Sequence, residues 1–245
     1  MKNSSTNKNQ ILLRIDAVAP GCHSRTSFMP PLVCKNIPFR TTRGDHGTGT
    51  EEFSESFRSG EITGFCGGRD FAPLLNALGM IERPSSGTLS VLGEDVLAIE
   101  EKAAWRLRDR AFGYLFTHHH LLPTFTVAEN VAMPFFRICG KREDLAAERT
   151  SEVLLFTGIR HLCGTPVGNL DDSTRWLVAL ARAIVHRPPL LVAISPPSPN
   201  LLPLVRCLAD NEGMAILWSG EKNHLLPFAD RIVESGGNLH SRPAP

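Results

Sequence analysis

The fold class is decided by residues 61–93, which read EITGFCGGRDFAPLLNALGMIERPSSGTLSVLG. The apolar run ITGFC predicts a strand, and the apolar spacing that follows predicts a helix over residues 73–80. The turn-rich ERPSSG then leads into a second predicted strand, TLSVLG. A strand, a helix and a strand in this order indicate an α/β fold.

The same order continues towards the C-terminus. Helices are predicted over residues 100–110, 127–138, 143–156 and 174–185, where apolar residues recur at spacings of three and four. Strands are predicted in AFGYLF (111–116), LLVAI (190–194), AILW (215–218) and RIVES (231–235). Strands that alternate with helices favour a parallel sheet. The helices predicted between about residue 120 and residue 172 form an all-helical insert.

The N-terminal part of the chain has a weaker pattern. Residues 11–18 alternate weakly and predict a first strand, whereas residues 20–55 are rich in Gly, Pro, Thr and Ser and show neither period. We therefore expect residues 1–55 to carry the first strands of the domain and residues 56–240 to form its main body.

The composition limits which class of protein, which partners and which cellular compartment are expected. A chain of 245 residues with 42% hydrophobic and 21% charged residues has enough apolar surface for one folded core. The net charge of +1 argues against nucleic acid as a partner. Six cysteines without a CxxC pair predict reduced thiols in the cytoplasm and no zinc. The polar start of the chain predicts no export, and no apolar run approaches the roughly 20 residues that span a bilayer.

Three longer strings are distinctive: LLNALGMIERPSSGTLSVLGEDV (74–96), LLPTFTVAENVAMPFF (121–136) and LVALARAIVHRPPLLVA (177–193). They resemble the ATP-binding subunits of ABC transporters of the lipoprotein-release and macrolide-export type, and the resemblance extends over residues 60–238. It implies a P-loop NTPase-like (RecA-like) lobe with an inserted helical subdomain, which is the ABC ATPase architecture.

Compared with the family pattern, the phosphate loop of this chain is altered. The motif G-x-x-x-x-G-K-[ST] places backbone amides, a lysine and a hydroxyl around the phosphates and magnesium. Residues 66–73 are about two residues too short for it, and Gly67, Gly68, Arg69 and Asp70 supply neither the lysine nor the hydroxyl. Asp70 adds a negative charge, and Arg69 is a poor substitute for the point charge of a lysine.

The other nucleotide motifs are altered as well. Thr117 stands where the family has the Q-loop glutamine, and Gly220 where it has the switch histidine. The Walker B aspartate and glutamate correspond to Ile194 and Ser195. The signature corresponds to Leu170, Asp171, Asp172, Ser173 and Thr174, whose two carboxylates would repel a triphosphate.

Together these losses imply a catalytically inactive ABC ATPase-like subunit, without a cofactor or metal, and not an enzyme. The implied partner is a membrane permease that holds the chain at the cytoplasmic side of the inner membrane, with an intact ABC ATPase paralogue or a second copy as a further partner. One alternative is a divergent but active ATPase that uses ATP and magnesium, and another is a cytosolic regulator derived from an ABC ATPase. The resemblance places the permease contact at Val127, Val131 and Phe135.

Other conspicuous residues have simpler interpretations. The triplet His118, His119 and His120 has no cysteine or carboxylate at a metal-ligand spacing, so a solvated loop is expected. Asp171 and Asp172 are expected to cap the helix that follows them. Trp105, Trp176 and Trp218 lie in helical or strand contexts and are expected to pack in the core or between lobes.

Overall fold

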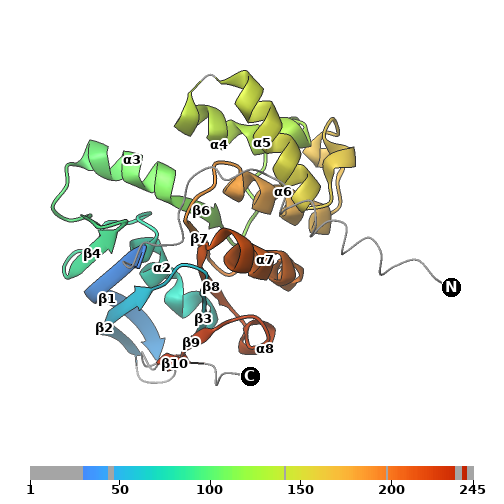
Figure 1. Ribbon diagram of the computed structural model, residues 1–245. Coiled ribbons are helices and arrows are strands. Elements are labelled where there is room, and N and C mark those ends of the chain that lie inside the picture. The colour runs from blue at the N-terminus through green and yellow to red at the C-terminus, as the bar shows by residue number, and fades with distance from the viewer. Residues whose placement is uncertain (1–29, 44–46, 141, 197, 235–238, 242–245) are drawn as a thin grey trace.

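The computed structural model describes residues 30–43, 47–140, 142–196, 198–234 and 239–241 (Figure 1). The strand predicted for residues 11–18 lies outside these ranges.

A mixed sheet forms the centre of the molecule. Its strand order is β10-β9-β3-β8-β7-β6. The strands are β3 (Ile62–Cys66), β6 (Phe112–Leu115), β7 (Leu190–Ala193), β8 (Ala215–Gly220), β9 (Arg231–Glu234) and β10 (Leu239–Ser241). All neighbours pair in parallel except β10, which is antiparallel to β9. The predicted parallel sheet and the α/β fold class are confirmed.

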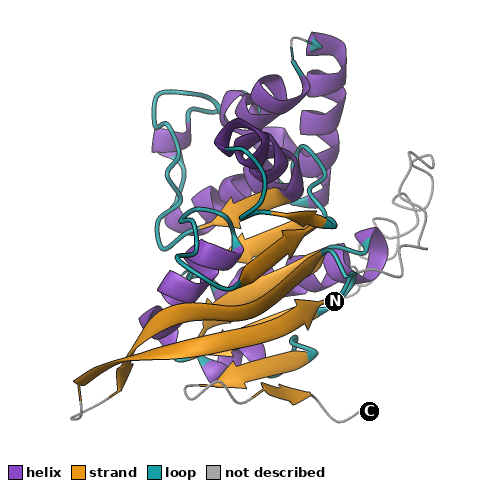
Figure 2. Cartoon of the chain, turned by 90° about the vertical axis from the view of Figure 1, so that its left-hand side faces the viewer, coloured by secondary structure: helices purple, strands orange, loops and turns teal. Residues whose placement is uncertain are grey.

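A second, antiparallel sheet lies beside the first (Figure 2). Its order is β2-β1-β4-β5, formed by β1 (Leu32–Arg43), β2 (Gly47–Phe57), β4 (Thr88–Val91) and β5 (Glu94–Asp95). The long β1–β2 hairpin falls in the stretch where we found no period. A bulge between Cys34 and Ile37 explains this, because it shifts the buried positions by one residue and breaks the alternation.

The helices are α2 (Ala72–Leu78), α3 (Glu101–Ala111), α4 (Val127–Cys139), α5 (Glu143–Phe156), α6 (Asp172–Ile184), α7 (Leu202–Glu212) and α8 (Lys222–Leu225). Short 3-10 helices cover Gly68–Phe71, Arg160–Leu162, Val167–Asn169 and Pro199–Leu201. Helices α4 and α5 form a separate lobe against α6, at the top of Figure 1. The predicted helices recur with ends that agree to within two residues.

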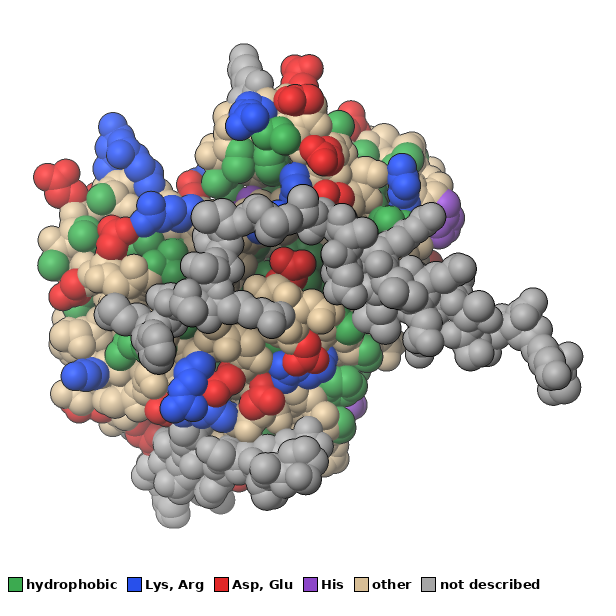
Figure 3. Space-filling view, viewed as in Figure 1, with side chains coloured by type: hydrophobic (Ala, Val, Ile, Leu, Met, Phe, Trp, Pro, Cys, Tyr) green, Lys and Arg blue, Asp and Glu red, His purple; other side chains and the backbone are tan. Residues whose placement is uncertain are grey.

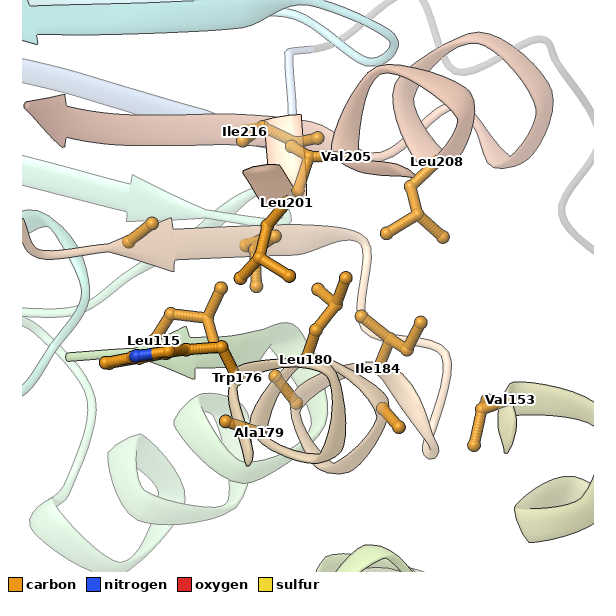
Figure 4. Close-up of a cluster of buried hydrophobic side chains, with 14 of the residues drawn as sticks. Leu115, Val153, Trp176, Ala179, Leu180, Ile184, Leu201, Val205, Leu208 and Ile216 are labelled. Carbon is orange, nitrogen blue, oxygen red and sulfur yellow. The ribbon is translucent and has the colours of Figure 1, made fainter. Parts of the chain in front are cut away.

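The central sheet separates two hydrophobic cores. Alternate residues of β8 show this: Ile216 and Trp218 join the core under α6 and α7, and Ala215 and Leu217 join the core under the antiparallel sheet. Figure 4 shows the first core, in which side chains of α6 and α7 meet over the sheet. In the second core, five phenylalanines pack together: Phe39, Phe53, Phe57, Phe65 and Phe71.

Two of the three tryptophans lie in the first core, as expected. Trp105 does not, since it is 53% exposed on α3. The side of α3 that packs on the protein is instead the one with Leu107 and Ala111. Within the described residues, no helix has the length and apolar character that a bilayer span requires.

Candidate functional site

The carboxyl ends of the parallel strands meet at one edge of the central sheet. The register aligns Cys66 with Gly220, Trp218 with Ala193, and Ala193 with Leu115. In open α/β sheets, this edge is where ligands bind. The fold therefore brings the altered phosphate loop, the Walker B position, Gly220 and the residues after β6 to a common edge.

The phosphate-loop segment continues directly into a helix. A 3-10 helix covers Gly68–Phe71, in which the amide of Asp70 donates to the carbonyl of Gly67 at 3.3 Å, and α2 begins at Ala72. Pro73 in the first turn has no N–H to offer. A phosphate loop must direct several free backbone amides at one centre. In this segment the amide of Asp70 is already bonded, and Pro73 has no amide N–H.

Phe71 stands at the start of α2, where the motif would place its lysine. Its side chain is 1% exposed. The ring stacks on Phe39 at a centroid distance of 6.0 Å and meets the edge of Phe65 at 5.4 Å. An aromatic ring thus fills the space beside β3 and fixes the segment to the core.

The end of β7 presents an apolar residue and a hydroxyl. Ile194 is buried in the second core, and its amide donates to Leu115 O at 2.8 Å. Ser195 has a left-handed backbone (φ 45°), and its amide donates to Ser219 Oγ at 2.8 Å. The two serine hydroxyls are 3.0 Å apart, and Thr117 Oγ1 donates to Ile194 O at 3.5 Å.

These hydroxyl contacts join β8 to the residues that follow β6 and β7. Thr117 and Ser195 are at the glutamine and glutamate positions of the family, and Ser219 is next to Gly220, the histidine position. Magnesium in nucleotide complexes is bound through at least one protein carboxylate and the phosphate oxygens, and these three side chains include no carboxylate. Sequence reasoning missed Ser219, which has no motif of its own. A Cβ added at Gly220 would fit without a clash, in van der Waals contact with Trp218 at 3.6 Å and with Leu225 at 3.8 Å.

A lysine and a glutamate do lie next to Cys66. Lys222 pairs with Glu234 at 2.5 Å, and the pair faces the Cys66 thiol. Burial raises the pKa of Cys66, with a further rise from Glu234. This thiol is therefore held in its unreactive, neutral form.

The signature segment caps α6. Asp171 is the N-cap residue, and its carboxylate accepts from the Thr174 amide at 2.9 Å and from the Thr174 hydroxyl at 2.7 Å. These bonds lower the pKa of Asp171. Asp172 accepts from the indole N–H of Trp176 at 3.2 Å. Asp171 therefore caps α6, whereas Asp172 is the first residue of the helix and binds the indole instead of a backbone amide.

The three histidines line a cavity of about 590 Å³ together with Thr117, Leu121, Asp172 and Trp176. No cluster of histidine, cysteine and carboxylate groups within the described part of the chain is arranged to hold a metal ion. His119 is the member that packs inward, against Trp176, while His118 and His120 are exposed.

The predicted permease contacts Val127, Val131 and Phe135 are wrong as surface residues, because all three are buried in the first core, at 0%, 0% and 6% exposure. They lie on the inner side of α4, which faces α5 and α6. The large apolar residues that α4 exposes are Met133 (41%) and Phe136 (40%). Helical periodicity could have found them, since they lie opposite the buried stripe.

An ion pair links helix α3 to helix α4. The guanidinium of Arg137 is 3.2 Å from the carboxylate of Asp109. Trp105 is one turn before Asp109 on α3, and Met133 is one turn before Arg137 on α4. Figure 3 shows the outline of the molecule hollowed between α3 and the α4 lobe. We refer to Trp105, Met133 and Phe136 as the α3–α4 face.

Comparison with known proteins agrees with this fold. The family model described as ABC transporter matches residues 51–194. The lipoprotein-releasing system ATP-binding protein LolD 2 of Caulobacter vibrioides is 33% identical over 184 residues, which are 71% of this chain and 80% of that protein. LolD of Pseudomonas syringae pv. tomato is 38% identical over 176 residues, covering 68% and 76% of the two chains.

Solved structures show the same fold at lower identity. A dimeric post-hydrolysis state of the ATP-binding cassette MJ0796, bound to ADP and Pi, has a TM-score of 0.73 at 18% identity and covers 87% of this chain and 100% of that chain. The cbiO1 protein from Clostridium perfringens, part of the ABC transporter complex cbiONQ, has a TM-score of 0.73 at 20% identity, covering 86% and 87%. The chain therefore belongs to the ABC transporter family, as an ATP-binding subunit of the lipoprotein-release type.

Proposed function

We propose that this chain is a catalytically inactive ABC ATPase-like subunit that associates with a membrane permease and has a structural or regulatory role in transport. It acts in the cytoplasm, peripheral to the inner membrane, through that permease. The observation that carries the proposal is the buried ring of Phe71, which occupies the start of α2 and packs on Phe39 and Phe65.

The end of β7 supports the same proposal. Hydrolysis needs a carboxylate for magnesium and a base for the attacking water. Ile194 is apolar and buried, and the Ser195 hydroxyl is 3.0 Å from the hydroxyl of Ser219. Among the described residues, the hydrogen-bond partner of the Ser195 side chain is another hydroxyl, and a serine hydroxyl is itself no base at neutral pH.

The test is a thermal-shift and calorimetric titration with MgATP, in which we expect no binding at millimolar concentration. A ligand at 100 times its Kd stabilises a fold by about 2.7 kcal/mol. For a domain of this size, that raises Tm by about 5–11 °C. An intact lipoprotein-releasing ATP-binding protein is the positive control. A rise of this size in the present chain would support the divergent, active ATPase instead.

The α3–α4 face is the surface that we assign to the permease. Trp105, Met133 and Phe136 are each at least 40% exposed, and large apolar side chains gathered on one face mark interaction sites. Neighbouring Lys102 and Arg106 are exposed on α3 and have no ion-pair partner among the described residues. The face thus combines apolar contact with positive charge.

Co-purification with the permease tests this assignment. Met133→Asp and Phe136→Asp should release the permease while leaving the circular dichroism spectrum unchanged. Leu226→Asp is the matched control, because Leu226 is 45% exposed at the end of α8, outside this face. If the two α4 variants retain the permease as well as the control does, the assigned surface is wrong. A wild-type chain that never co-purifies would favour the cytosolic regulator.

An intact ABC ATPase paralogue or a second copy of the chain is the further partner that we propose. In the family, each ATP lies between the phosphate loop of one subunit and the signature of the other. Asp171 and Asp172 at the start of α6 would face the partner's nucleotide with negative charge. We therefore expect any such pair to form without closing on ATP, which size measurements with and without MgATP would test.

A further inference from the structure

His119 joins the segment after β6 to helix α6. Its ring meets the edge of the Trp176 ring at a centroid distance of 5.8 Å, and its Nε2 is 3.8 Å from Asp172 Oδ1. The backbone of the same segment is fixed separately, because the Arg182 guanidinium donates to the carbonyls of His119 and His120 at 2.6 Å each. The imidazole and the indole together form the inner wall of the histidine cavity.

The environment of this imidazole favours its neutral form. Its Nδ1 is buried and has no hydrogen-bond partner among the residues that the structure describes. A proton there would create a buried N–H without an acceptor, which is more costly than an unpaired nitrogen lone pair. Arg175, Arg182 and His120 oppose a positive charge on the ring, and Asp172 favours it. The Asp172 side chain is 73% exposed, so water screens its attraction.

We propose that His119 is an acid-released latch, which in its neutral form covers Trp176 and which moves into solvent when the imidazole gains a proton. The cavity beside the ring and the water around Asp172 give the charged ring a place to go. This inference concerns the chain by itself and does not depend on the proposed partnership.

The direction of the pH effect follows from burial. Burial lowers the pKa of His119 from its ordinary value of 6.5, against the raising effect of Asp172. The contact between His119 and Trp176 in the folded chain therefore favours the neutral imidazole. This contact is complete above about pH 6.5 and is lost as the pH falls through the lowered pKa of His119.

The movement of His119 away from Trp176 should affect residues 117–121 alone. Beyond them, Asn130 is buried and its side chain holds the next residues: it accepts from the Leu122 amide at 2.8 Å and donates to the carbonyls of Leu122, Phe125 and Thr126. None of these bonds involves a group that titrates near neutral pH. The start of α4 should therefore remain in place when His119 leaves Trp176.

Acrylamide quenching of tryptophan fluorescence in a Trp105→Phe background tests the latch. The two remaining indoles, Trp176 and Trp218, are 3% and 2% exposed, so quenching should be weak at pH 7.5. We expect the quenching constant to rise as the pH falls below 6.5, at a constant circular dichroism spectrum. His119→Phe should abolish the rise, because a phenyl ring stays neutral at every pH.

His118→Phe is the matched control, since His118 lines the same cavity but does not contact Trp176. It should leave the acid response intact. An acid response that persists in His119→Phe, or that is absent from the Trp105→Phe parent, overturns the proposal. If the variants do not fold, NMR of the unmodified chain decides: the His119 ring and the Trp176 indole N–H must titrate together, and independent titration overturns the latch.

Discussion

Replacement of Phe71 tests whether the altered phosphate loop has become part of the hydrophobic core. Phe71→Ala removes a ring that is 1% exposed and contacts Phe39 and Phe65. Buried Phe→Ala changes cost about 3–5 kcal/mol. In a chain of this size, each kcal/mol lowers Tm by about 2–4 °C, so we expect a fall of about 6–20 °C. Phe71→Leu, which keeps most of the apolar volume, should cost about 1–2 kcal/mol.

Phe71→Lys is the sharper variant, because it restores the side chain that the family uses to bind phosphate. A lysine here would place an ammonium group among phenylalanine rings without an anionic partner. We expect it to destabilise the chain at least as much as Phe71→Ala. MgATP should not recover the loss, which urea denaturation with and without nucleotide would measure. A Phe71→Lys chain that is as stable as wild type and binds MgATP would refute the reasoning, since the segment would then still be a working phosphate loop.

Three further predictions concern other parts of the fold. Val131→Asp should unfold the α4 lobe, whereas Met133→Asp on the same helix should change the free energy of unfolding by less than about 1 kcal/mol, as measured by denaturation. Thr126→Ala should destabilise α4 by about 1 kcal/mol, because Thr126 forms a capping box with Glu129, and equal urea midpoints would contradict it. Burial raises the pKa of Cys34 to about 12, so iodoacetamide at pH 8 should modify exposed Cys139 and spare Cys34 until the chain is unfolded, as read by mass spectrometry.

The sequence by itself determined most of the strand and helix order from residue 61 onward, but helix α7 (Leu202–Glu212) was not predicted. Helix 143–156 was predicted with the bounds of α5, and the strand in 190–194 differs from β7 by one residue. Residues 143–156 have apolar residues at spacings of three and four, and residues 190–194 form a continuous apolar run, so both elements are visible locally. The altered nucleotide motifs are likewise visible in the sequence, because each is defined by residue type at a fixed spacing.

Other features depended on contacts between residues that are far apart in sequence. The β1–β2 hairpin was missed because a bulge breaks its alternation, and its buried positions are defined by packing on Phe65 and Phe71. The hydroxyl pair of Ser195 and Ser219 comes from two neighbouring parallel strands. No local pattern marks either feature.

Helix α4 shows most clearly which features the sequence determines and which the tertiary structure decides. Its amphipathic pattern predicted a helix, but not which of its apolar residues would be covered. Val127, Val131 and Phe135 became core because α5 and α6 pack on that side, and Met133 and Phe136 were left exposed. A helical period specifies that an apolar stripe exists. Which apolar residues remain outside that stripe, free to meet a partner, is decided by the elements that the tertiary fold brings against it.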